Sequence, residues 1–294
     1  MKSQLSDALS GVLDKIKCNP SLSDNKTGLS TGIEVLDVYF RGITPGEVTV
    51  ISGQRRHQFS LILNIILNIG LNTDTSIYYF SLGLTKENFA LKLLCCHTDV
   101  SMQKPYTGMC SNLELEALTK SARTIETSGI KLQATDELAI QNLRDTIIDI
   151  DKNDKKTKFI VVDFMQNINF NRDFSTEHLF MVHSIETIKD IAKDTNMPIV
   201  ALYYEYEKEM SGQSQISGDD LVNLMHTDLD ALILVNDTMS SGSSEDQDSD
   251  DPYLKIFFAD KYGMRADFII QYSPHSLKTV NKPSIEAPKL YEPG

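Results

Sequence analysis

Gly53 and Ser60 have the spacing of a P-loop and follow the apolar run 48–51. In such a loop, backbone N–H groups and a lysine bind the phosphates of a nucleotide, and a serine or threonine hydroxyl binds Mg²⁺. The lysine is missing here, because Phe59 occupies its position, or Gln58 if the loop is one residue shorter. The spacing therefore indicates a phosphate-binding scaffold that has lost its main positive charge.

Three further residues could take part in this chemistry. Arg55 and Arg56 lie inside the loop and could bring positive charge to the phosphates. Together with the glycine and the serine of the loop, they are the candidates for nucleotide binding. Asp163 ends an apolar, β-branched run and is, with Ser60, a candidate metal ligand. The alternative for Asp163 is structural, because a carboxylate at a strand end also serves as a helix cap or loop anchor.

The pattern of the surrounding chain predicts an α/β fold. Short β-branched or aromatic runs alternate with helical patterns, which is typical of a parallel sheet with crossover helices. Residues 60–69 are apolar almost all round and are predicted to form a helix. Thr85, Ser111 and Ser175 are predicted N-caps of three further helices, the last of which runs to about residue 194.

Residues 27–280 are predicted to form one domain, and the segments around it differ in character. Residues 1–18 are predicted to be an amphipathic helix. Its apolar face consists of Leu5, Leu9, Val12, Leu13 and Ile16. Residues 19–26 form a polar linker. Residues 238–252, rich in serine and aspartate, are predicted to be a disordered acidic loop, and 281–294, with three prolines, an unstructured tail.

The composition favours a globular cytoplasmic protein that does not bind DNA on its own. The chain has 294 residues, of which 41% are hydrophobic, enough to bury a sizeable core. Its longest apolar run is interrupted by Asn64 and Asn68 and is too short to cross a bilayer. The net charge is −13, whereas proteins that grip a phosphate backbone present a basic surface. The four cysteines lack the spacing of a metal or redox site: Cys18, Cys95, Cys96 and Cys110.

The chain resembles the C-terminal motor domain of DnaB-type replicative helicases over residues 27–280. The runs that carry the resemblance follow one another in the family's order: 27–37, 42–47, 77–82, 159–166, 198–202 and 228–234. The resemblance implies a RecA-like P-loop NTPase fold, with a mostly parallel sheet flanked by helices. It also implies that the helix at 1–18 is a linker that docks onto a neighbouring subunit of a ring; the alternative is that it folds back onto its own domain.

The resemblance also implies where the catalytic residues of an ATP-dependent DNA helicase should stand. The positions of the phosphate-binding lysine, the water-activating glutamate, the sensor glutamine and the arginine finger carry Phe59, Gly83, Tyr204 and Gly263. None of these side chains can do the corresponding chemistry. Gln166 and Lys261 match the family and are further nucleotide-binding candidates.

These losses predict a protein that does not hydrolyse ATP, because removing one such element typically slows the reaction about 10²- to 10⁵-fold. We expect neither ATP nor Mg²⁺ as a cofactor, and an ATP affinity weaker than about 1 mM. The predicted role is a binding or scaffolding partner in DNA replication, which associates with itself or with an active replicative helicase. Two alternatives remain open: a divergent helicase motor that binds ATP through Arg55, Arg56 and Ser60, and a RecA-fold regulator outside replication.

Overall fold

The computed structural model describes residues 28–204, 229–237, 253–280 and 289–290. The predictions for residues 1–18, 19–26 and 238–252 lie outside this part of the chain. The prediction of an unstructured tail over 281–294 is wrong at two residues, because Lys289–Leu290 form the short strand β12. This strand pairs with the first residues of β10, on the side of β10 away from β9.

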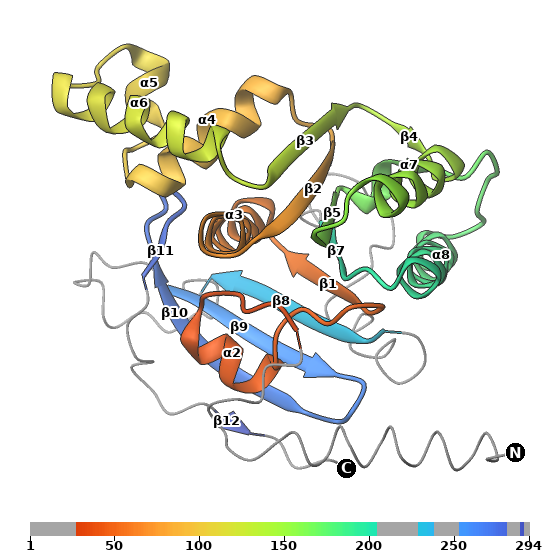
Figure 1. The fold of residues 1–294 in the computed structure, drawn as a ribbon. Helices are drawn as coiled ribbons and strands as arrows, with labels where there is room; N and C mark the ends of the chain where they lie inside the picture. The colour runs from red at the N-terminus through yellow and green to blue at the C-terminus, as the bar shows by residue number, and fades with distance from the viewer. Residues whose placement is uncertain (1–27, 205–228, 238–252, 281–288, 291–294) are drawn as a thin grey trace, which may run out of the picture.

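A mixed, mostly parallel sheet forms the centre of the molecule (Figure 1). Its strands are β1 Val48–Gly53, β2 Thr75–Leu82, β3 Ile130–Thr135, β5 Thr157–Asp163, β7 Ile199–Tyr204, β8 Ala231–Asp237, β9 Tyr253–Asp260, β10 Arg265–Tyr272 and β11 Thr279–Val280. Their order across the sheet is β11-β10-β9-β8-β1-β7-β5-β2-β3. The block from β8 to β3 is parallel, whereas β9, β10 and β11 are antiparallel to their neighbours. The predicted fold class is confirmed.

Helices cover this sheet and account for the buried strands. They are α2 Glu34–Phe40, α3 Arg55–Asn72, α4 Lys86–Thr98, α5 Gln103–Thr107, α6 Asn112–Glu126, α7 Ile140–Asn153 and α8 Glu177–Thr195, with a 3₁₀ turn η1 at Met165–Asn167. Two small strands, β4 Leu138–Ala139 and β6 Ile168–Asn169, pair beside α7. Every residue of β1 and β7 is buried, as expected for central parallel strands covered on both faces.

Two of the three predicted N-cap residues are confirmed. Thr85 accepts the N–H of Asn88, and Ser111 forms a capping box with Glu114. The third helix is capped by Thr176 rather than by Ser175, because the Thr176 hydroxyl accepts the N–H of Leu179. Within the described residues, no helix is both long and apolar enough to cross a membrane.

Candidate functional site

Four of the predicted site positions meet at one edge of the sheet. Strands β1, β7, β5 and β2 are neighbours in this order and run in the same direction, so their carboxyl ends lie together. Gly53, Tyr204 and Asp163 are the last residues of β1, β7 and β5, and Gly83 follows β2 directly. Open α/β sheets bind their ligands at the carboxyl ends of their strands. We call the position of these four residues the strand-end site.

The loop that should bind phosphates is replaced by helix. Strand β1 ends at Gly53 and helix α3 begins at Arg55, so only Gln54 lies between them. The backbone N–H groups of His57 and Gln58 already donate to the carbonyl oxygen of Gln54, at 3.0 and 3.2 Å. The predicted helix at residues 60–69 is present, and it extends beyond this range at both ends, because α3 spans Arg55–Asn72. The residues expected to encircle a phosphate are wound into the first turn of α3.

A side chain occupies the position of the second P-loop glycine. Gln58 is fully buried, and its Nε2 donates to the carbonyl oxygens of Gly53, at 2.7 Å, and Tyr203, at 2.5 Å. Gly53 itself has a positive φ of 134°, and a Cβ atom there would lie 2.0 Å from the carbonyl oxygen of Val235 in β8. The close approach of two strands therefore explains this glycine without any nucleotide.

Phe59, at the lysine position, belongs to an aromatic cluster that we define as Phe59, Phe164 and Tyr204. Its side chain is 2% exposed, and the rings of Phe164 and Tyr204 lie 4.0 Å apart, centroid to centroid. The Arg55 guanidinium lies over this cluster, 4.2 Å from the Phe164 centroid and 5.8 Å from that of Phe59. Lys92 of α4 approaches the Phe59 ring to 5.4 Å. Cation–π contacts therefore occupy the position at which the P-loop lysine would contact phosphate groups.

The remaining nucleotide-binding candidates contact other parts of the protein. Nε of Arg56 lies 2.8 Å from Nε2 of the buried His57. Gln166 donates to the carbonyl oxygen of Tyr204 at 2.9 Å. Lys261 lies in the turn between β9 and β10 and pairs with Glu47 at 2.7 Å and with the buried Asp230 at 3.1 Å. Gly263 lies in the same turn, with a φ of 89°.

The two candidate metal ligands also have different partners. The Ser60 hydroxyl donates to the carbonyl oxygen of Leu277 at 2.8 Å, and Asn64 donates to the same oxygen at 2.9 Å. Ser60 thus anchors the turn between β10 and β11 onto α3. Asp163 is fully buried and accepts a hydrogen bond from the Tyr204 hydroxyl at 2.8 Å. Within the described residues, no group of three or more His, Cys, Asp or Glu side chains could hold a metal ion.

Burial raises the pKa of Asp163 to about 6. The hydroxyl of Tyr204, the nearby hydroxyl of Tyr79, and the positive charges of Arg55 and Lys92 act in the opposite direction. Burial also raises the pKa of Tyr204 and Tyr79 well above the ordinary tyrosine range. The site therefore holds a carboxyl group that is costly to ionise, beside two neutral phenols.

This pKa predicts a measurable pH dependence. A carboxyl whose pKa is higher in the folded state contributes stability that is fully present below its unfolded pKa and is lost as pH rises through about 6. Asp163→Asn keeps an oxygen that can accept the Tyr204 hydroxyl and removes the cost of ionisation. We expect the free energy of unfolding of this variant to exceed that of wild type by about 1–3 kcal/mol at pH 7.5, with a gap that closes by about pH 4.

Urea denaturation at several pH values measures this difference. The same series on Asp190→Asn provides a control, because Asp190 is an exposed carboxyl on α8. A lower stability of Asp163→Asn at pH 7.5 would contradict this prediction, and a gain in wild-type stability with Mg²⁺ that Asp163→Asn lacks would show that the ionised carboxylate binds the metal.

The sequence did not indicate several residues that shape this site. Lys92 and Tyr79 lie inside a helical and a strand pattern without any motif that distinguishes them. Phe164 has a left-handed backbone, with φ of 64° and ψ of 63°, which is uncommon for a bulky residue and turns its ring onto Tyr204. Gly83 has a φ of 133°, and a Cβ there would meet the side chains of Asn167 and Phe164. Only the structure shows these neighbours.

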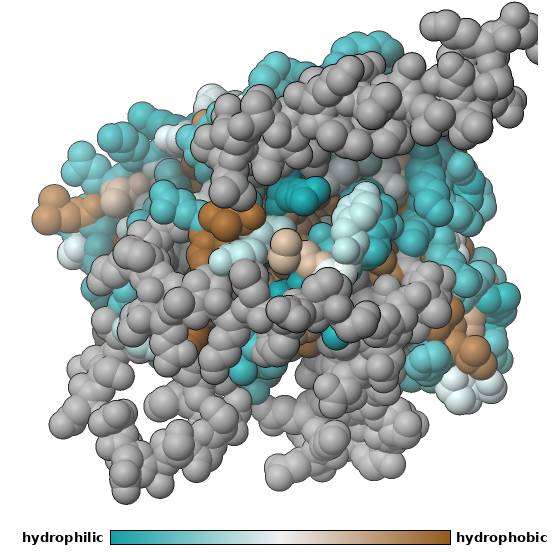
Figure 2. Space-filling model, turned by 90° about the horizontal axis from the view of Figure 1, so that it is seen from below, coloured by the Kyte–Doolittle hydropathy of each residue, from teal (hydrophilic) through white to brown (hydrophobic). Residues whose placement is uncertain are grey.

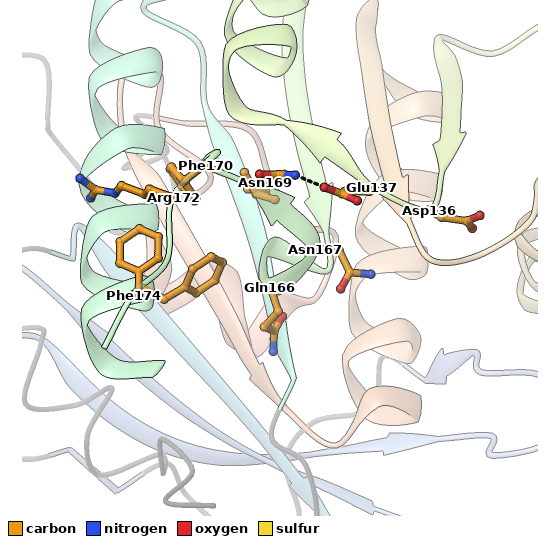
Figure 3. A pocket seen from close by; sticks show the side chains of 10 residues that line it. Asp136, Glu137, Gln166, Asn167, Asn169, Phe170, Arg172 and Phe174 are labelled. Carbon is orange, nitrogen blue, oxygen red and sulfur yellow. Dashed lines mark hydrogen bonds between the residues drawn. The ribbon is translucent and has the colours of Figure 1, made fainter. Parts of the chain in front are cut away.

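An open pocket of about 360 Å³ lies beside the strand-end site (Figure 3). Gln166 and Asn167 of η1 form one wall, and Phe170 and Phe174 form another with Phe180 of α8. Glu137 accepts a hydrogen bond from Asn169, and Asp136 lies next to it. Among the described residues, two carboxylates line this pocket against the single positive charge of Arg172, which makes it unfavourable for phosphate groups.

Comparisons with known proteins agree with this fold. Residues 28–212 match the family of DnaB-like helicase C-terminal domains. The replicative DNA helicase DnaC of Bacillus subtilis is 24% identical over 200 residues, which make up 67% of this chain and 44% of that protein. DnaB of Helicobacter pylori is 24% identical over 177 residues, 60% of this chain and 36% of that protein. This chain therefore spans less than half the length of these relatives.

Solved structures give the same result at the level of the fold. One solved ATPase domain has a TM-score of 0.80 at 15% identity, and the match covers 96% of this chain and all of that domain. A DnaB-like replicative helicase, described with its interactions with primase, has a TM-score of 0.77 at 15% identity, over 96% of this chain and 68% of that one.

Proposed function

The chain belongs to the DnaB-like helicase C-terminal domain family, and we propose that it is a member that does not hydrolyse ATP and acts as a binding or scaffolding partner in DNA replication. The observation that supports this most is the filled phosphate site. Only Gln54 lies between the last residue of β1 and the first residue of α3, so no open loop remains. Phe59 and Gln58 are buried at the positions where a P-loop lysine and glycine would bind phosphate groups.

The missing catalytic groups support the same proposal. In-line hydrolysis needs phosphate neutralisation, an oriented water and positive charge at the transition state. Gly83 has no side chain that could orient the water, and Gly263 has none that could supply the positive charge. Tyr204, at the sensor position, donates its hydroxyl to Asp163, and its ring packs at a tilt against that of Phe164. Because the loss of one element typically costs about 10²- to 10⁵-fold in rate, the combined loss leaves no effective cycle.

One observation favours the competing proposal of a divergent motor that still binds ATP. Arg55 and Lys92 both approach the Phe59 ring, so two positive charges lie near the lysine position. Lys92 of α4 thus adds a positive charge near the position of the missing lysine. We place this alternative second, because Arg55 lies on aromatic faces and the loop that would surround the phosphates is helical.

We further propose that the protein works through assembly in the cytoplasm, with a second copy or an active replicative helicase, rather than by binding DNA alone. Exposed apolar side chains on and between α5 and α6 support this proposal, and we define the apolar patch as Tyr106, Met109 and Leu113. Leu113 is 78% exposed. Figure 2 shows hydrophobic surface at its left edge, on the side where Figure 1 places α5 and α6.

The proposed occupant of this patch is the apolar face predicted for residues 1–18 of a second copy. Five buried aliphatic side chains can contribute about 1.5–3 kcal/mol each before the entropy of ordering is counted. We expect deletion of residues 1–18 to dissociate the oligomer, or its complex with a replicative helicase, while the domain stays folded. Leu113→Glu should have the same effect, because it places a charge in the patch.

Light scattering measures the assembly, and circular dichroism measures the folding of each variant. Leu179→Glu is the matched control, because Leu179 is also an exposed leucine, 50% accessible, but lies on α8. A full-length protein that is monomeric and binds no helicase would contradict the proposal. Unfolding of the truncated protein would show instead that the segment completes its own domain.

A further inference from the structure

A second open pocket, of about 430 Å³, lies away from the strand-end site. Its walls are residues 31–33, the outer face of α3, the end of α4 and the turn that leads into β11. The polar residues that carry the argument are Asn64, Asn68, Asn72, His97, Lys278 and Thr279. The three asparagines follow one another at four-residue spacing, so they share one face of α3.

The charge of this pocket differs from that of the whole chain. The net charge of the protein is −13, yet the described residues that line the pocket include a lysine and a histidine and no carboxylate. The neighbouring Asp37 accepts hydrogen bonds from the backbone and hydroxyl of Thr31. Asp99, at the end of α4, accepts one from the Ser276 hydroxyl. In the described part of the chain, the charged group that lines the pocket is therefore Lys278, and both neighbouring carboxylates are hydrogen-bonded within the protein.

Two of the asparagine side chains in the pocket can each donate a hydrogen bond to a ligand. Asn72 donates one N–H to Asn68, and Asn68 donates one to the carbonyl oxygen of Ser30. Each amide has a second N–H for another acceptor. His97 Nδ1 lies 2.8 Å from the Ser121 hydroxyl, so Nε2 is the ring nitrogen left to donate to an anion when it carries a proton.

The backbone that carries Lys278 is held in place. The carbonyl oxygen of Leu277 accepts hydrogen bonds from Ser60 and Asn64, and the N–H of Thr279 donates to Asn64 at 3.1 Å. The carbonyl oxygen of Lys278 accepts the N–H of Ser273 at 2.7 Å. The lysine side chain thus projects from a fixed turn, which lowers the entropic cost of binding.

We propose that this pocket binds a small anion that carries a phosphate or carboxylate group, with Lys278, His97 and Asn72 as the donors. Leu67 and Leu71 also line the pocket and can contact the carbon part of such a ligand. Hydrogen bonds from a charged donor to an oxyanion are stronger than those between neutral groups. This inference does not depend on nucleotide binding at the strand-end site.

The test uses the full-length protein, with inorganic phosphate and succinate as separate probes. Two-dimensional NMR follows the side-chain amides of the asparagines and the ring of His97 during each titration. We expect saturable shifts with at least one probe. Lys278→Met and Asn72→Asp should each weaken binding about tenfold or more, because one removes the charge and the other adds a repelling carboxylate of the same size.

Lys152→Met is the matched control, because Lys152 is an exposed lysine on α7. Circular dichroism checks that each variant is folded. Saturation by phosphate alone assigns the pocket to phosphorylated ligands, and saturation by succinate alone to carboxylates. The absence of saturable shifts with both probes, or binding that Lys278→Met and Asn72→Asp leave unchanged, would overturn the proposal.

Discussion

Purified protein is expected to release phosphate from Mg-ATP no faster than its Asp163→Ala variant. The positions that should bind the phosphates, activate water and supply a finger carry Phe59, Gly83 and Gly263. Removing any one such group typically costs about 10²- to 10⁵-fold. A coupled assay of phosphate release measures this, with an active replicative helicase as the positive control.

Single-stranded DNA should not restore turnover, because the missing groups belong to the site itself. Turnover well above background that disappears in Asp163→Ala would show that this carboxylate still supports catalysis. The proposal of a non-hydrolysing protein would then be wrong, and the divergent motor would replace it.

Returning the lysine by Phe59→Lys is expected to destabilise the protein rather than to restore nucleotide binding. Phe59 is 2% exposed and packs in the aromatic cluster. A lysine there loses the ring and places a buried charge near Arg55 and Lys92, which lie 5.8 and 5.4 Å from the present ring centroid. We expect a loss of about 3–5 kcal/mol in the free energy of unfolding.

Phe59→Leu is the control for the lost ring, because it keeps an apolar side chain and adds no charge. It should cost clearly less than Phe59→Lys, and urea denaturation of both variants measures the difference. A Phe59→Lys protein that is as stable as Phe59→Leu and gains micromolar affinity for Mg-ATP would show that the phosphate site is still open.

Much of the fold could be predicted from the chain, because the signals for it are local. The alternation of β-branched runs and helical patterns indicated the parallel sheet, and Thr85 and Ser111 marked helix starts through their own hydroxyl groups. The resemblance to the helicase family identified Gly53, Asp163 and Tyr204 as site positions, and the structure brings them together at the carboxyl ends of parallel strands.

The contacts of the site could not be predicted, because they join residues far apart in the chain. The Ser60 hydroxyl donates to the carbonyl oxygen of Leu277, 217 residues away. Lys92 reaches Phe59 from α4 through packing that no motif records. The first turn of α3 also begins earlier than expected, because the carbonyl oxygen of Gln54 accepts the backbone N–H groups of His57 and Gln58.

Titration calorimetry of the full-length protein with Mg-ATP tests directly whether the phosphate site is closed to nucleotide. We expect a dissociation constant weaker than about 1 mM, which corresponds to roughly −4 kcal/mol. Arg55→Ala should leave this result unchanged. Micromolar binding that Arg55→Ala or Lys92→Ala abolishes would contradict this expectation, because these side chains would then act as the phosphate clamp.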